Sequence, residues 1–187
     1  MPNSTSRKLV ILDRDGVINV DSDAFIKSAD EWIALPGSLE AIARLNQAGY
    51  RVAVATNQSG IGRGLFDTTA LNEMHAKMQR QTAAVGGRID AVFFCPHTAQ
   101  DHCDCRKPKP GMLKMIADRF EIDPADTPVV GDSLRDLQAG AVLGFPTHLV
   151  LTGKGAKTLA AGGLPDGTKV HDDLRAFVLD FLANESA

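Results

Sequence analysis

Two aspartates with one residue between them, Asp13 and Asp15, directly follow the apolar run Leu9–Leu12. A run of branched apolar residues without polar alternation predicts a strand that is buried on both faces. Residues two apart in an extended backbone point to the same side, so we expect both carboxylates to face one crevice. Adjacent carboxylates are typical ligands of a hard cation such as Mg²⁺. The alternative is a solvated acidic strand end or a helix cap.

All three cysteines of the chain fall between positions 95 and 105. Such clustering favours a metal site in a reducing compartment over a disulfide scaffold. Thiolates and imidazoles at this spacing suit tetrahedral Zn²⁺, and four protein ligands would leave no open position, as in structural sites. We predict a structural zinc-binding loop with the ligands Cys95, His97, Cys103 and Cys105, and with His102 as the alternative to His97.

Further residues suited to bind an anion lie in two segments. Arg106 and Lys107 follow the cysteines directly, and the prolines beside them restrict the backbone that carries these cations. The second predicted strand ends in a polar, glycine-rich turn at 56–64, whose backbone N–H groups suit an anion. The candidate substrate-binding residues of this turn are Thr56, Asn57, Gln58 and Ser59.

These residue types allow phosphoryl transfer. If Asp13 and Asp132 hold Mg²⁺, one carboxylate can attack phosphorus in line and form an acyl phosphate. Asp15, one pleat further along, can protonate the leaving alkoxide and later deprotonate the water that hydrolyses the intermediate. One carboxylate cannot serve as both nucleophile and acid.

The elements that must position these residues alternate between strand and helix. Strands are predicted at 9–12, 51–56, 89–95, 128–132 and 147–151. Helices are predicted at 38–48, at 70–85 with Thr68 or Thr69 as the cap, at 112–120, at 133–143, and at the end of the chain after Asp172 or Asp173. We expect loops at 20–35 and 152–167.

This alternation predicts an α/β fold, a Rossmann-like parallel sheet with helices on both faces, in a single domain over residues 1–187. Asp13, Asp15, Thr56 and Asp132 each lie at the carboxyl end of a predicted strand. In an open parallel sheet the carboxyl ends of the strands meet at one crevice, so we expect these side chains to converge there.

The charge composition limits the classes of binding partner that we expect. The chain has 20 Lys and Arg residues against 23 Asp and Glu residues, a formal net charge of -3. This composition gives no sign of a basic surface that would bind nucleic acid or an anionic membrane. The short N-terminal segment is too brief for a signal peptide. We therefore expect a cytoplasmic monomer that acts on a small molecule.

Taken together, the motifs resemble the haloacid dehalogenase superfamily of phosphohydrolases. Asp13-x-Asp15 matches its first motif, Thr56 its second, Lys107 its third, and Gly131-Asp132 with Asp136 its fourth. The Asp-Arg-Asp-Gly start, the glycine-rich turn and the Cys-Asp-Cys-Arg-Lys-Pro block are similar to the heptose bisphosphate phosphatase branch. This resemblance implies removal of the C7 phosphate of a sugar bisphosphate, D-glycero-D-manno-heptose 1,7-bisphosphate, on the route to lipopolysaccharide or surface glycans.

The resemblance also implies roles for individual residues. Asp13 would be the nucleophile and Asp15 the acid and base, with Mg²⁺ held by Asp13, Asp132 and the main-chain carbonyl of Asp15. Thr56 and Lys107 would contact the transferred phosphoryl group, and Arg106 the second phosphate. The loop after the first motif would contact the sugar through Asp21, Ser22, Asp23 and Ala24. The segment at 20–35 is too short for a cap domain, so the enzyme would be capless.

Three other functions compete with this interpretation. The histidinol-phosphate phosphatases share the Asp-Arg-Asp-Gly start and the zinc loop, but differ in the turn after Thr56. A phosphoacceptor signalling domain also gathers acids, a hydroxyl and a lysine at strand ends. A zinc-stabilised interaction module would leave Asp13, Asp15 and Asp132 unexplained.

Overall fold

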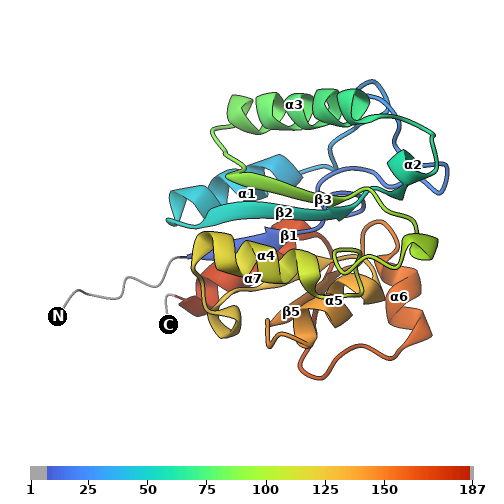
Figure 1. Ribbon diagram of the computed structural model, residues 1–187. Coiled ribbons are helices and arrows are strands. Elements are labelled where there is room, and N and C mark those ends of the chain that lie inside the picture. The colour runs from blue at the N-terminus through green and yellow to red at the C-terminus, as the bar shows by residue number, and fades with distance from the viewer. Residues whose placement is uncertain (1–7, 186–187) are drawn as a thin grey trace.

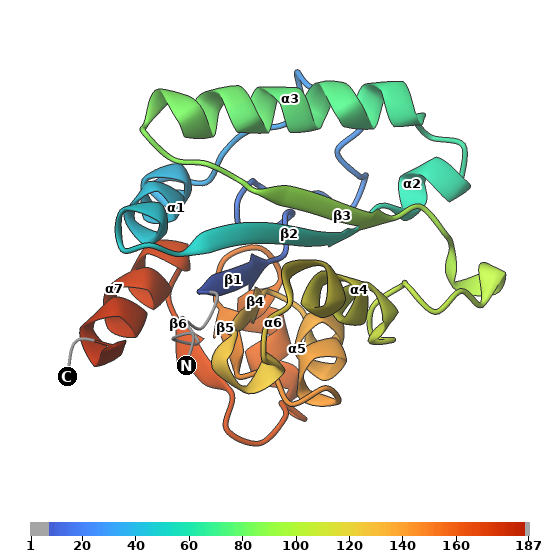
Figure 2. The ribbon, with the colours of Figure 1, turned by 60° about the vertical axis from the view of Figure 1, so that its left-hand side comes forward.

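The computed structural model describes residues 8–185, which form one six-stranded parallel sheet in the order β3-β2-β1-β4-β5-β6, covered by helices on both faces (Figures 1 and 2). The strands are β1 (Leu9–Leu12), β2 (Arg51–Asn57), β3 (Ala91–Cys95), β4 (Val129–Gly131), β5 (Thr147–Val150) and β6 (Lys169–His171). The helices are α1 (Ser38–Gln47), α2 (Ser59–Gly62), α3 (Thr68–Ala84), α4 (Gly111–Phe120), α5 (Leu134–Ala141), α6 (Gly155–Ala161) and α7 (Leu174–Glu185). The predicted Rossmann-like α/β architecture is confirmed.

Strand β1 lies at the centre of the sheet and supplies both halves of the core. Val10 and Leu12 face the layer of α1, α3 and α7, while Leu9 and Ile11 face the layer of α4 and α5. All four side chains are buried. This explains why the strand has no polar alternation, since neither face meets water. The two layers lie on opposite sides of the sheet in Figure 2.

Side-chain caps fix where several helices begin. The Asp67 carboxylate accepts a hydrogen bond from the backbone N–H of Ala70 at 2.9 Å, so the cap of α3 is Asp67 and the prediction of Thr68 or Thr69 was wrong. Asp173 accepts from the N–H of Ala176 at 2.7 Å, which confirms the expected start of α7. Ser133 and Asp136 form a reciprocal capping box at the start of α5.

The structure differs from the predictions in two glycine-containing segments. Residues 152–167, expected to be a loop, contain α6, because a run of helix-forming residues lies between Gly155 and Gly162, whose φ is 74°. The turn at 56–64 contains the single-turn helix α2. Strand β6 was not predicted, since it is a three-residue edge strand with no buried side chain to mark it.

None of the helices in the described part of the chain is both long enough and apolar enough to cross a bilayer.

Candidate active site

Acidic side chains that follow two neighbouring strands lie close together and form one cluster. Asp13 follows β1, Asp132 follows β4, and Asp136 lies in the first turn of α5. One carboxylate oxygen from each of the three lies within 4.8 Å of the other two, an arrangement that could hold a metal ion. The predicted convergence of Asp13 and Asp132 is therefore present in the structure, and Asp136 joins them.

Lys107 carries the positive charge at the centre of this group. Its Nζ lies 3.1 Å from Oδ1 of Asp13 and 2.7 Å from Oδ1 of Asp136, and it donates a hydrogen bond to the carbonyl of Ala55 at 2.6 Å. The side chain is only 3% exposed. A buried ammonium with three oxygen partners is fixed in place, so Lys107 is poised beside the Asp13 carboxylate.

Asn57 holds the backbone of Lys107. Its side-chain amide donates to the Lys107 carbonyl at 3.0 Å, and its Oδ1 accepts from the Lys107 N–H at 3.1 Å. These two hydrogen bonds tie the end of β2 to the segment after the cysteine loop. Asn57 thus lines the cavity and also positions Lys107.

Negative charge exceeds positive charge among these groups. Burial and the neighbouring Asp136 raise the pKa of Asp13 to about 7, and burial and Asp13 raise the pKa of Asp132 to about 8. Burial alone would also raise the pKa of Asp136, but Lys107 outweighs it and the pKa is lowered. For Lys107, the two carboxylates outweigh burial and raise the pKa. The pair Asp13 and Asp132 therefore favours a further positive charge.

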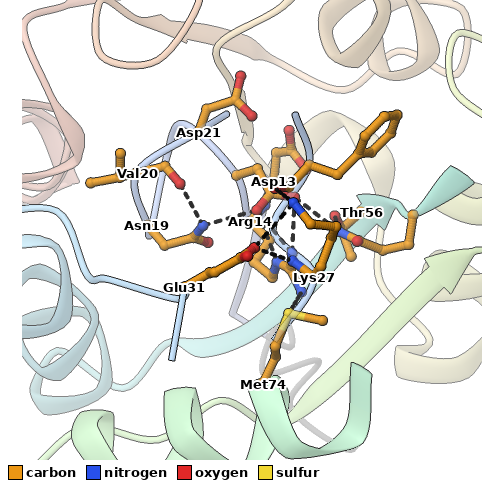
Figure 3. A network of polar contacts seen from close by, with 12 residues as sticks. Asp13, Arg14, Asn19, Val20, Asp21, Lys27, Glu31, Thr56 and Met74 are labelled. Carbon is orange, nitrogen blue, oxygen red and sulfur yellow. Dashed lines mark hydrogen bonds and ion pairs between the residues drawn. The ribbon is translucent and has the colours of Figure 1, made fainter. Parts of the chain in front are cut away.

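Asp15 is held apart from this group by its own donors. Its carboxylate receives hydrogen bonds from Nε and Nη2 of Arg14 at 2.9 to 3.2 Å, from the Asn19 amide at 2.9 Å and from the Gln58 amide at 2.8 Å; Arg14 and Asn19 are labelled in Figure 3. Burial would raise the pKa of Asp15, but the Arg14 charge and these hydrogen bonds lower it. The two aspartates of the first motif thus have opposite electrostatic environments.

The remaining predicted site residues fall into two groups. Asp21, Ser22, Asp23, Asn57, Gln58, Ser59 and Arg106 line the same cavity as Asp13, Asp15, Lys107 and Asp132, whereas Ala24 and Thr56 are not among the lining residues. Thr56 is 1% exposed, and its hydroxyl accepts a hydrogen bond at 2.8 Å from the Gln58 amide that also contacts Asp15.

Three further cations that were not predicted as site residues line the cavity: Arg63, Arg135 and Lys154. The Lys154 N–H donates to Oδ2 of Asp132 at 2.8 Å, and its Nζ lies 3.3 Å from Asp21 and 3.6 Å from Asp23. Arg135 and Lys154 both come just after a strand end, so the rule that identified Asp132 also applies to them. No sequence motif, however, indicated these two residues.

Two glycines bring backbone close to Asp132. A Cβ atom at Gly16 or at Gly153 would collide with Oδ2 of Asp132, and both glycines have positive φ, of 84° and 56°. The backbones after β1 and β5 therefore close around this carboxylate from two sides.

The predicted zinc ligands form a second cluster. The Sγ atoms of Cys95 and Cys105 each lie 3.6 Å from that of Cys103, and Nδ1 of His97 lies 3.6 and 3.4 Å from Cys95 and Cys105. Tetrahedral Zn²⁺ with Zn–S bonds of about 2.3 Å needs sulfur atoms about 3.8 Å apart. These four residues could hold a metal, and His102 does not belong to the group.

Comparison with known proteins identifies the family. The profile of the haloacid dehalogenase-like hydrolases matches residues 6–144, three quarters of the chain. The chain belongs to the haloacid dehalogenase-like hydrolases. This membership confirms the resemblance seen in the sequence and decides in favour of an enzyme over a signalling domain or an interaction module.

Two similar proteins carry the same name. A protein of Bordetella bronchiseptica is 64% identical over 169 residues, covering 90% of this chain and 94% of the relative. One from Neisseria meningitidis is 59% identical over 172 residues, covering 91% and 92%. Both are called D-glycero-beta-D-manno-heptose-1,7-bisphosphate 7-phosphatase.

Solved structures agree with the family assignment. The crystal structure of D,D-heptose 1,7-bisphosphate phosphatase from B. bronchiseptica, complexed with magnesium and phosphate, has a TM-score of 0.94 and 62% identity, covering 95% of this chain and 99% of that one. The same enzyme from Burkholderia thailandensis has a TM-score of 0.77 and 73% identity, covering 94% and 99%.

Proposed function

We propose that this hydrolase removes the C7 phosphate of D-glycero-D-manno-heptose 1,7-bisphosphate to give heptose 1-phosphate, through an aspartyl phosphate on Asp13. The observation that carries the proposal is the cavity in which Asp13 lies beside Lys107, with Asp15 and Asp132 also lining it. Relatives that carry this name at 59 to 64% identity span about nine tenths of the chain, which supports the same substrate.

The carboxylates fit Mg²⁺ as the catalytic cofactor. Asp13 and Asp132 would supply oxygen ligands, together with the main-chain carbonyl of Asp15, and their raised pKa values are a sign of uncompensated negative charge. Asp136 stays outside this set, because its Oδ2 accepts from Ser133 and its Oδ1 pairs with Lys107. A bound Mg²⁺ would offset negative charge on the transferring phosphoryl group.

Asp13 is oriented for attack on phosphorus. Its Oδ1 contacts Lys107 Nζ at 3.1 Å and accepts a hydrogen bond from the Arg14 N–H at 2.8 Å, and these two contacts fix the rotation of the carboxylate. Attack forms the Asp13–phosphorus bond and breaks the bond to the C7 oxygen. Lys107 stabilises charge on the phosphoryl oxygens during this step.

Asp15 moves the protons. It gives a proton to the C7 oxygen as that bond breaks, then takes one from the water that hydrolyses the acyl phosphate. Its lowered pKa keeps it ionised in the free enzyme, which suits the second step. For the first step it gains a proton when the negative phosphate lies beside it, because a like charge raises a carboxyl pKa.

The other cations of the cavity fit a substrate with two phosphates. Arg106 would bind the phosphate that does not react, and Asp21, Ser22, Asp23 and Ala24 would form the loop that meets the sugar. Arg106 lies close enough to Arg63 and Arg135 for their charges to lower its pKa further after burial has done so. An anion would relieve that repulsion.

The Cys95, His97, Cys103 and Cys105 cluster fits structural Zn²⁺, as its distances match a tetrahedral site. The zinc would fix the segment that leads directly into Arg106 and Lys107. Reduced thiolates are consistent with a cytoplasmic enzyme, for which we also propose a monomeric state.

A substrate panel tests the proposal. Phosphate release is measured from synthetic α- and β-heptose 1,7-bisphosphate and from histidinol phosphate, with Mg²⁺ and with chelator. We expect Mg²⁺-dependent release from a heptose bisphosphate to be the fastest reaction. Faster release from histidinol phosphate would assign the enzyme to the other phosphatase branch.

A further inference from the structure

Arg14 is a buried cation that takes no direct part in the proposed phosphoryl or proton transfer. Arg14, between the two catalytic aspartates, is 0% exposed. Its Nε and Nη2 donate three hydrogen bonds to the Asp15 carboxylate. Its third nitrogen, Nη1, points the other way, toward α3, where it lies 3.2 Å from Nε2 of His75 and 4.0 Å from the sulfur of Met74 (Figure 3 labels Arg14 and Met74).

The contact with Arg14 defines the protonation state of His75. A guanidinium has only donors, so Nε2 of His75 must be the acceptor and the ring proton must be on Nδ1. Burial and the Arg14 charge lower the pKa of His75 to about 4, so the ring is neutral near pH 7. A protonated ring would place two donors against each other.

We propose that His75 is a positioning residue for the proton-transfer step: by accepting from Nη1, it holds the Arg14 guanidinium in the plane that orients the Asp15 carboxylate. This inference rests on the proposed role of Asp15 as acid and base. Without His75, a buried N–H of Arg14 would keep only the weak sulfur acceptor of Met74. The guanidinium would then turn toward other acceptors and carry the Asp15 carboxylate with it.

A packing role for His75 would have a different outcome. It would affect the folding of α3 against the sheet and leave the reaction of the folded enzyme unchanged. A positioning role affects departure of a poor leaving group, which needs the proton of Asp15, more than departure of p-nitrophenolate, which leaves without one.

The kinetic test compares His75→Leu, which removes the acceptor, with His75→Gln, which can supply a side-chain oxygen. His148→Leu removes a buried histidine ring that does not line the cavity and serves as the control. For heptose bisphosphate, we expect His75→Leu to lower kcat/KM about tenfold, and His75→Gln to restore much of it. For p-nitrophenyl phosphate, kcat/KM should hardly change, and His148→Leu should leave the ratio of the two substrates at the wild-type value.

A second measurement determines the tautomer of His75 in the wild-type protein itself. Long-range ¹H–¹⁵N spectra of the wild-type protein at pH 7, with His75 assigned by its loss in His75→Gln, should show the Nδ1–H tautomer. An Nε2–H tautomer, or equal losses for both substrates in His75→Leu, would overturn the inference. An inactive wild type, or an active Asp15→Asn variant in the same assay, would instead contradict the proposed function.

Discussion

At the scale of single residues, the structure divides the polar side chains into those that react and those that hold them. Asp13 and Asp15 were identified from their position after an apolar run, and that reasoning needed no coordinates. The supporting contacts within the site could not be predicted, because Asn57, Gln58 and His75 act through hydrogen bonds to residues 43 to 61 positions away. Long-range hydrogen bonds leave no periodic signal in a sequence.

Replacement of Asp15 tests the proton transfer. Asp15→Asn keeps a side chain of the same shape but can neither give nor take the proton. We expect both formation and hydrolysis of the phosphoenzyme to slow, with a loss in kcat of about 10² to 10⁴. Rapid-quench and steady-state assays measure the two steps, and a normal rate in both would remove Asp15 from this role.

Replacement of Asn57 tests how Lys107 is held. Asn57→Ala removes both hydrogen bonds to the Lys107 backbone, so we expect lower kcat and a loss of stability of about 1–2 kcal/mol from two unpaired backbone groups. Urea titration and phosphate release measure the two effects. A variant that keeps wild-type kcat would show that Lys107 needs no support from β2.

At the scale of elements, strands buried on both faces were predicted well and irregular glycine segments were not. Burial of β1 on two sides produces an unmistakable apolar run, whereas β6 has three residues with no buried side chain. Helix α6 was not predicted, because the glycines beside it indicated a loop, whereas in the structure they lie at its two ends. The clustering of Cys95, His97, Cys103 and Cys105 was predicted, because all four residues lie within one short segment.

The zinc loop can be tested through stability and metal content together. Cys103→Ser removes one thiolate from the cluster, so the protein should contain less zinc and unfold at a lower temperature. His102→Asn is the matched control, because His102 lies in the same loop but outside the cluster. Unchanged zinc stoichiometry in Cys103→Ser, measured by atomic emission, would contradict the ligand set.

The paired histidines of β5 and β6 predict a pH dependence of stability. Nδ1 of His148 lies 3.0 Å from Nε2 of His171, and burial lowers the pKa of His148 from 6.5 to about 4. Between these pH values the unfolded chain binds a proton that the folded chain does not, so stability falls as the pH falls through this window. Summed over the window, the loss from His148 is about 3 kcal/mol.

Urea unfolding at pH 7.0 and 4.5 measures this effect. His148→Phe keeps an aromatic ring against Phe177, which lies 4.8 Å from the His148 ring between centroids. The difference in stability between the two pH values should be smaller in His148→Phe than in the wild type. Equal differences would show that the pair does not contribute, since other groups such as His75 titrate in both proteins.

At the scale of the whole molecule, the clustered carboxylates of the active site lower the stability of the folded state, and the packing of the rest of the sheet offsets this cost. The raised pKa values of Asp13 and Asp132 mean that folding brings negative charges together against their electrostatic preference. Function requires this arrangement, because the same carboxylates suit a divalent cation. The fold class, the meeting of strand ends and the position of Lys107 were predictable; the full charge balance was not, since it also depends on Arg135 and Lys154, which no sequence motif placed at the cavity.

Neutralising one carboxylate should therefore stabilise the metal-free protein. In chelator, we expect Asp132→Asn to raise the unfolding midpoint by roughly 3 °C, equivalent to about 1 kcal/mol. Mg²⁺ should raise the midpoint of the wild type but barely that of the variant, because a ligand stabilises only the state that binds it. A lower midpoint for Asp132→Asn in chelator would contradict this charge balance.

The central claim is that Asp13 removes the C7 phosphate, and ³¹P NMR of β-heptose 1,7-bisphosphate tests it most directly. With wild-type enzyme and Mg²⁺, the C7 resonance should be replaced by inorganic phosphate while the C1 resonance remains. With Asp13→Asn, correctly folded by circular dichroism, both substrate resonances should persist. Loss of the C1 phosphate first, or appreciable turnover by Asp13→Asn, would contradict the account.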